Sequence, residues 1–312
     1  MRVFVTGASG WIGSAVVPEL LAHGHEVTGL ARSDASAAAL TAAGARAVRG
    51  SLDDLGTLRD AAAASDGVLH LAFKHDIAFS GGFEQAADAD RRAIETFGEA
   101  LAGTDRPFVI ASGLLGLAPG RVATEEDGRT GAAEAGHPGG GPAQRMANAR
   151  AVVALAERGV RSSVVRLPPT VHGDGDQGFV PAVIATAREK KVSAYIGDGA
   201  SRWPAVHRAD AARLFRLALE DAPAGATLHA VGDEGVPIRS VAEVIGRHLG
   251  LPVASITPEE APAHFTWLAN FLGLDSPASA ERTRALLGWE PVEPGLLEDL
   301  DKGHYFTGAA ER

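Results

Sequence analysis

The sequence predicts an α/β fold with a doubly wound parallel sheet, followed by a smaller mixed α/β domain. In the first half, short apolar runs alternate with longer helical patterns, as parallel strands joined by crossover helices do. A glycine-rich turn at residues 7–13 follows the first apolar run directly. Beyond Pro168-Pro169 the alternation becomes irregular. This change predicts where the second domain begins.

The elements of the first half follow from these patterns. Buried apolar runs predict strands at 2–6, 26–31, 45–49, 67–72, 107–112 and 161–167. Helical periodicity predicts helices at 11–22, 35–43, 54–64, 83–103 and 143–158. Pro18 lies inside the first of these helices and predicts a kink there. The polar, glycine-rich segment 113–142 is long enough to form a lid or a wall of the site.

The second half predicts fewer elements. Helices are expected at 179–188, 208–220 and 238–249, with a strand at 227–231. We expect residues 206–232 to return to the first sheet, so that residues 1–168 and 206–232 form one domain. Residues 169–205 and 233–312 then form the smaller, substrate-binding domain. Its aromatic side chains either line an apolar pocket or pack the core, and they are Phe179, Trp203, Phe265, Trp267 and Phe271.

Composition narrows the class of protein. With 312 residues, 46% of them hydrophobic, the chain can bury a large core. A net charge of −10 argues against nucleic-acid binding, and the absence of cysteine excludes disulfides and thiolate metal sites. No signal core and no apolar run of about 18 residues is evident. We therefore expect a cytoplasmic protein with a small-molecule substrate and no nucleic-acid or membrane partner.

The glycine turn indicates a dinucleotide. Its spacing is G-x-x-G-x-x-G, between a strand and a helix, which is the context of a Rossmann-type phosphate-binding turn. Glycines permit the tight turn, the close approach of the pyrophosphate and the packing of helix on sheet, while the helix N-terminus attracts the phosphates. The predicted contacts to the pyrophosphate of NAD or NADP are Gly7, Ser9, Gly10, Trp11, Ile12 and Gly13.

The end of the second strand favours NADP. A carboxylate there would bind the ribose 2′-OH of NAD, but this chain has Arg32-Ser33, a cation and a hydroxyl suited to a 2′-phosphate. Asp34 lies close by and weakens the preference, so NAD stays an alternative. The other interpretation of Arg32 is an ordinary solvated arginine.

Five segments resemble motifs of one family, namely residues 6–13, 70–72, 110–112, 166–173 and 206–212. On these motifs the chain resembles the short-chain dehydrogenase/reductase superfamily, in particular the atypical group of its NAD-dependent epimerase/dehydratase branch. The resemblance implies further cofactor contacts from Ser51, Leu52, Leu71, Ala72, Phe73, Ser112, Leu167, Pro168 and Pro169. Ser51 stands where the family has an adenine-contacting Asp. The resemblance also implies that helices 83–103 and 143–158 pair in a homodimer.

One family feature is missing. The catalytic Tyr-x-x-x-Lys pair has no equivalent, because the chain has only two tyrosines, Tyr195 and Tyr305, and no lysine between Lys74 and Lys190. Gly140 falls near the tyrosine position and Gln144 near the lysine position. Any reductase chemistry must therefore use another proton donor.

Four residues are candidates for that chemistry. Ser112, at a strand end, can hydrogen-bond a carbonyl oxygen, or it simply ends the strand. His75, beside Asp76, is a candidate general acid, although Asp76 can instead cap a helix. His172 is a second candidate acid. Arg145 can stabilise an oxyanion but cannot donate a proton, and its alternative is a structural salt bridge.

The remaining polar motifs have structural interpretations. His207 and Asp210 are expected to be structural or helix-capping, and no cluster has metal-ligand spacing. The leading function is an NADPH-dependent reductase of a small carbonyl or sugar-like substrate. The alternatives are an epimerase, isomerase or cyclase without net redox change, and a non-catalytic NADP sensor.

Overall fold

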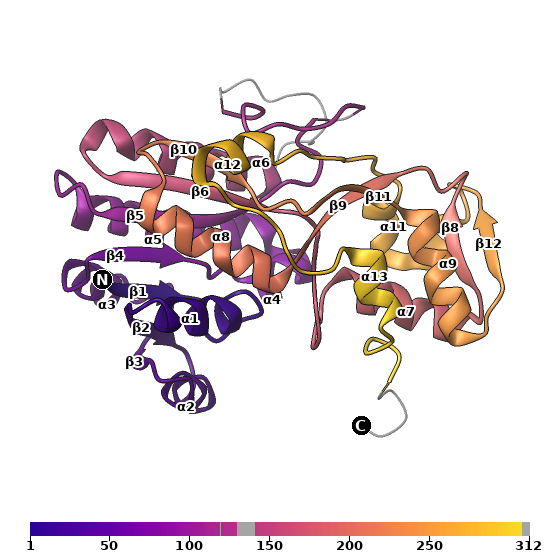
Figure 1. Ribbon diagram of the computed structural model, residues 1–312, viewed down its shortest axis with the longest axis horizontal. Coiled ribbons are helices and arrows are strands. Elements are labelled where there is room, and N and C mark those ends of the chain that lie inside the picture. The colour runs from indigo at the N-terminus through magenta and orange to yellow at the C-terminus, as the bar shows by residue number, and fades with distance from the viewer. Residues whose placement is uncertain (119, 130–140, 308–312) are drawn as a thin grey trace.

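The computed structural model describes residues 1–118, 120–129 and 141–307. Its larger part is a seven-stranded parallel sheet in the order β10-β6-β5-β4-β1-β2-β3 (Figure 1). The strands are β1 (Arg2–Thr6), β2 (Glu26–Ala31), β3 (Arg46–Arg49), β4 (Gly67–His70), β5 (Pro107–Gly113), β6 (Arg161–Leu167) and β10 (Ala226–His229). The order reverses between β1 and β4, so these two strands form the switch point at which such sheets bind ligands.

Helices cover both faces of this sheet because the strands are buried on both sides. One face packs against α1 (Gly13–Ala22), α2 (Asp34–Ala42) and α8 (Arg208–Asp221). The other packs against α3 (Leu55–Ala63), α5 (Phe83–Leu101) and α6 (Gly141–Ala154), which continues as the 3-10 turn η2 (Leu155–Arg158). Short α4 (His75–Ile77) and the π-helical turn η1 (Ala78–Gly82) precede α5.

The smaller part holds a second core around two short sheets. One sheet has the order β11-β9-β7, and the other pairs β12 with β8. The strands are β7 (Thr170–His172), β8 (Ser193–Ile196), β9 (Arg202–His207), β11 (Asp233–Pro237) and β12 (Val253–Ile256). The helical segments are α7 (Phe179–Lys190), α9 (Ile238–Leu249), α10 (Ala261–Phe265), η3 (Thr266–Leu268), α11 (Ala269–Leu272) and α13 (Leu296–Asp301), while α12 (Glu281–Leu287) returns to β10.

The predicted doubly wound sheet is confirmed, and several bounds match to the residue, including those of β2, β6 and α9. The first helix begins at Gly13 and not at residue 11, because residues 7–12 form the turn itself. Five strands of the smaller part were not predicted. Each has three to six residues and lies outside the regular strand–helix alternation that made equally short strands of the first half predictable. None of the helices in the described ranges is long and apolar enough for a membrane span.

Asp210 fastens the C-terminal segment onto α8. Its buried carboxylate accepts hydrogen bonds of 3.1 Å from both Val292 N and Glu293 N. The indole of buried Trp289 donates to the Asp210 carbonyl at 3.0 Å. His207 caps the same helix by accepting from Ala209 N at 3.3 Å. The structural and capping interpretations of His207 and Asp210 are therefore confirmed.

We expect the substitution Trp289→Ala to lower the free energy of unfolding by about 3–5 kcal/mol, because it empties a large buried site. Urea denaturation followed by circular dichroism measures the change. Val292→Ala is the matched control, since this side chain is 70% exposed and its truncation should change stability by less than about 0.5 kcal/mol. Equal effects of the two substitutions would contradict the structural role of Trp289.

Candidate functional site

The glycine turn packs against the end of β4 with no room for a side chain. Gly7 has φ +67°, and a Cβ built there would lie 2.7 Å from Ala72 N. A Cβ on Gly13 would lie 2.1 Å from Gly7 O, where α1 meets the turn. Both positions therefore need glycine, and the turn lies at the switch point between β1 and β4.

The turn residues between these glycines divide into two groups. Ser9 and Gly10 are exposed at the tip, as phosphate contacts require. Ile12 instead packs against the core. Trp11 donates from its indole to Val171 O at 2.9 Å, and the Arg208 guanidinium lies 4.1 Å from the Trp11 ring. Trp11 thus anchors the turn to the segment after the proline pair.

The two predicted 2′-phosphate contacts, Arg32 and Ser33, both have neighbouring side chains or backbone groups within the protein. Arg32 is 73% exposed, with Asp76 3.9 Å away. The hydroxyl of Ser33, however, accepts from Ser36 N at 3.1 Å and caps α2. The capping bond already uses this oxygen, which weakens the prediction that Ser33 binds a 2′-phosphate. The Asp34 carboxylate forms an ion pair with the Arg49 guanidinium, 3.4 Å away.

The predicted adenine contacts follow β3. The Ser51 hydroxyl donates to Asp54 Oδ2 at 2.8 Å, so it shapes the loop in the place of the family's Asp. Leu52 is buried in the core beneath β2. The hydrogen bonds from Ser51 lower the pKa of Asp54.

Several of the other predicted cofactor contacts lie together at the carboxyl edge of the sheet. His70 pairs with Ile110 in the register of β4 and β5, so Ser112 lies at the same edge as Leu71 and Ala72. The backbone of Leu114 bonds to that of Leu167 at 3.0 Å. The next residues are Pro168, which is buried, and Pro169, which is partly buried.

Two of the catalytic candidates meet on one aromatic ring. The Arg145 guanidinium lies 3.8 Å from the centroid of Phe73, and the His75 ring lies 5.1 Å from the same centroid. Displacement of water by its neighbours, and secondly the positive charge of Arg145, lower the pKa of His75 to about 4, against a smaller opposing effect of Asp76. His75 is therefore neutral at pH 7 and still carries one N–H, so its role as a general acid stays a prediction.

The alternative interpretation of Asp76 as a helix cap is wrong. Asp76 lies inside α4, and the residue before that helix, Lys74, bonds to Asp53 at 2.7–2.8 Å. The short helix continues into η1 without a side-chain cap. The carboxylate of Asp76 is instead exposed toward Arg32.

A buried polar chain, which the sequence did not reveal, supports this edge. Thr6 Oγ1 lies 2.7 Å from His70 Nδ1, and His70 Nε2 lies 3.1 Å from Asp90 Oδ1. Asn148 Nδ2 donates to the other Asp90 oxygen at 2.8 Å. Burial alone would raise the pKa of Asp90, but these hydrogen bonds and the charges of His70 and Arg145 lower it overall.

A carboxylate can only accept hydrogen bonds, so His70 Nε2 donates to Asp90. This hydrogen-bonded chain joins β1, β4, α5 and α6. Its successive residues are 64, 20 and 58 positions apart in the sequence. Such separations leave no local motif.

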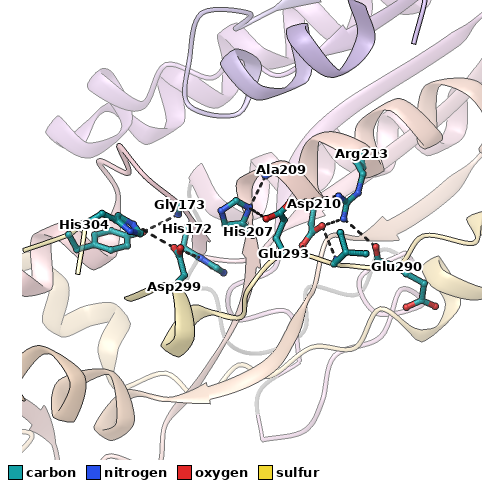
Figure 2. A network of polar contacts seen from close by, with 12 residues as sticks. His172, Gly173, His207, Ala209, Asp210, Arg213, Glu290, Glu293, Asp299 and His304 are labelled. Carbon is teal, nitrogen blue, oxygen red and sulfur yellow. Dashed lines mark hydrogen bonds and ion pairs between the residues drawn. The ribbon is translucent and has the colours of Figure 1, made fainter. Parts of the chain in front are cut away.

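His172 is not at this edge. It is fully buried, its Nδ1 lies 2.9 Å from Asp299 Oδ2, and its ring lies 5.4 Å from that of His207. His304 Nε2 lies 3.7 Å from the same Asp299 oxygen. Figure 2 shows these side chains in a row that continues to Asp210. The burial contradicts a direct substrate role for His172, which instead ties β7 to α13.

Gly140 and Gln144 are the positions predicted to align with the family's Tyr and Lys. Gln144, near the predicted lysine position, donates from its side-chain amide to Asp88 on α5. Gly140 and most of the predicted 113–142 loop after residue 129 lie outside the described residues. Throughout 1–118, 120–129 and 141–307, no three His, Asp or Glu side chains are grouped so that they can hold a metal ion.

Comparisons with known proteins place this geometry in context. The profile of the NAD dependent epimerase/dehydratase family matches residues 3–231. "Uncharacterized protein C2A9.02" of Schizosaccharomyces pombe is 47% identical over 307 residues, covering 98% of this chain and 100% of that protein. The 2'-dehydrokanamycin reductase of Streptomyces kanamyceticus is 30% identical over 322 residues, covering 100% of this chain and 82% of that protein.

Among solved structures, the fold is similar to that of DesIV, a dTDP-glucose 4,6-dehydratase from Streptomyces venezuelae with NAD and TYD bound. The TM-score is 0.75 at 20% identity, and the match covers 97% of this chain and 96% of that chain. At this identity the likeness shows the fold alone.

We expect Gly7→Ala to raise the Kd of the dinucleotide at least about tenfold, because the left-handed backbone and the contact with Ala72 both disfavour a Cβ. Isothermal titration calorimetry measures the change. Gly56→Ala is the matched control, since a Cβ there on α3 meets nothing within 4 Å. Unchanged affinity in Gly7→Ala would remove the turn from the cofactor site.

Proposed function

Because the chain belongs to the NAD dependent epimerase/dehydratase family, we propose that it is a dinucleotide-dependent reductase of a carbonyl group in a small organic molecule. One observation carries the proposal. Arg145 and His75 meet on the Phe73 ring, three residues after β4, beside the glycine turn. The full-length similarity to a protein named as a reductase supports the direction of the reaction.

The residues of the site fit a bound dinucleotide. Gly7 and Gly13 leave the turn free of side chains, and Ser9 and Gly10 are exposed at its tip. When bound, the cofactor supplies the hydride that reduces the carbonyl carbon. The protein must then stabilise the negative charge that develops on the oxygen and deliver a proton to it.

Three side chains can divide this work. We assign Ser112, at the end of β5, to a hydrogen bond with the carbonyl oxygen, and Arg145 to stabilisation of its negative charge. Arg145 cannot release a proton at neutral pH. Neutral His75 carries one N–H and one lone pair, so it can pass a proton from water to the oxygen. This division replaces the absent Tyr-x-x-x-Lys pair.

The proposed cofactor is NADPH. Arg32 lies at the end of β2 with its side chain 73% exposed, and its partner Asp76 is itself 70% exposed. An exposed pair of this kind contributes little and separates easily, leaving the guanidinium available to a 2′-phosphate.

We expect Arg145→Ala to lower kcat/KM for carbonyl reduction about 100-fold or more, because it removes the charge that faces the developing oxyanion. The measurement is cofactor oxidation at saturating NADPH over a panel of aldehydes and ketones. Arg145→Lys should recover part of the loss. Arg158→Ala, which removes an exposed arginine after the same helix, should leave the rate within about twofold.

The same measurements distinguish the alternatives. Conversion of a substrate without net cofactor oxidation would indicate an epimerase or isomerase. Cofactor binding without any turnover would indicate a sensor. Because the pKa of His75 is about 4, the rate should not change between pH 6 and 8 on account of this group. A strong pH dependence in that range that is lost in His75→Gln would contradict this assignment.

We expect Arg32→Ala to weaken NADPH binding about tenfold while leaving the Kd of NADH nearly unchanged, because only NADPH carries the 2′-phosphate. Calorimetric titration with both cofactors measures the two constants. Arg46→Ala, which removes an exposed arginine at the amino end of the neighbouring strand β3, is the control. Equal losses for the two cofactors would remove Arg32 from cofactor selection.

A further inference from the structure

A line of aromatic rings leads away from the Arg145 cluster. We define the aromatic tract as Phe73, His75, Phe79, Trp267 and Phe179. Neighbouring ring centroids along it are separated by 5.1, 5.9, 6.0 and 5.6 Å. Its first three rings follow β4 of the large sheet, whereas Trp267 and Phe179 belong to the smaller part. The tract therefore connects the two parts, beginning beside the glycine turn.

The middle of the tract is exposed. Phe79 is 59% exposed and Trp267 is 48% exposed, although their rings contact each other. Large aromatic side chains contribute most to stability when they are buried, so two neighbouring exposed rings need a reason. The Phe271 ring packs edge-on against the Trp267 ring, with centroids 5.9 Å apart.

The backbone on both sides is held in an uncommon conformation. Thr266, directly before Trp267, has φ +52°, a left-handed conformation that is strained for a residue with a Cβ. Gly81, two residues after Phe79, has φ +98°, which glycine adopts without strain. Strain such as that at Thr266 persists where the surrounding structure enforces it, and it concentrates at ligand sites.

The segments that present the two exposed rings have no charge. Ala78–Gly82 and residues 261–272 contain no Lys, Arg, Asp or Glu. A substrate with a diphosphate needs cations or helix N–H groups along its length. Stacked aromatic faces instead favour planar apolar groups.

We propose that the aromatic tract binds a substrate with planar aromatic rings, two or three fused rings in extent, whose carbonyl lies at the Phe73 and His75 end. This inference rests on the reductase function proposed above and names its substrate class. The spacing of 5–6 Å between successive centroids lets one fused-ring ligand contact Phe79 and Trp267 together.

The test separates binding from turnover. The probes are 2-naphthylmethanol, which the reduced cofactor cannot reduce, and naphthalene-2-carbaldehyde, which it can. Acetaldehyde serves as a carbonyl too small to reach Phe79 and Trp267. In the protein loaded with reduced cofactor, with which this alcohol cannot react, Phe79→Ala and Trp267→Ala should each raise the Kd of 2-naphthylmethanol about fivefold. Trp267→Phe should recover most of that affinity. Leu286→Ala, an exposed apolar residue on α12, should have no effect.

In the reductase assay, the same variants should lower kcat/KM for the naphthaldehyde and leave that for acetaldehyde within about twofold. If the Kd of 2-naphthylmethanol rises in these variants but the wild-type protein does not reduce the naphthaldehyde, the tract is supported and the reductase function is contradicted. Three results overturn the tract itself: equal Kd values in wild type and variants, tighter binding of UDP-glucose than of 2-naphthylmethanol, or a Kd that rises with protein concentration because the rings pair in a dimer.

Discussion

Gly7 lies so close to the end of β4 that a Cβ would overlap the backbone of Ala72. This contact fixes where the turn stands relative to the carboxyl edge of β4, and therefore relative to everything that follows that strand. Phe73 and His75 follow within three residues of Ala72, and Arg145 packs on the Phe73 ring. The phosphate-binding turn and the proposed chemical residues are thus positioned by one backbone contact, not by separate loops.

The buried chain from Thr6 to Asn148 stabilises the same arrangement from below. It connects the last residue of β1 and of β4 to the two helices that carry Asp90 and Arg145. Each member makes at least one hydrogen bond in a water-poor interior, where such bonds are strong, although Asn148 Oδ1 has no partner among the described residues. Such a network resists small shifts of α6 relative to the sheet. The position of Arg145 consequently depends on residues that never reach the substrate.

The parts of the fold that could be predicted from the sequence are those with a local signal. The strands of the large sheet are buried on both faces, so β2 and β6 were placed to the residue. In the smaller part, α9 was placed to the residue because its apolar residues repeat every three to four positions. The small strands had no such signal. In the site, the glycine motif and Arg145 were visible locally. The hydrogen bonds of Asp90, the burial of His172 and the meeting of Phe79 with Trp267 depend on tertiary contacts between distant segments.

The return of the chain to the large sheet has a consequence for the order of synthesis. The sheet face that packs on α1 is covered by α8, which follows the first strands of the smaller part, and β10 forms the sheet edge still later. A nascent chain that has released only residues 1–168 therefore exposes apolar strand surface that its own residues cannot cover. Trp289 and Asp210 fasten this assembly only after the chain has been synthesised beyond residue 289. Folding of the dinucleotide domain is thus completed after synthesis of the segment that separates its two parts, and the exposed face must be protected until then.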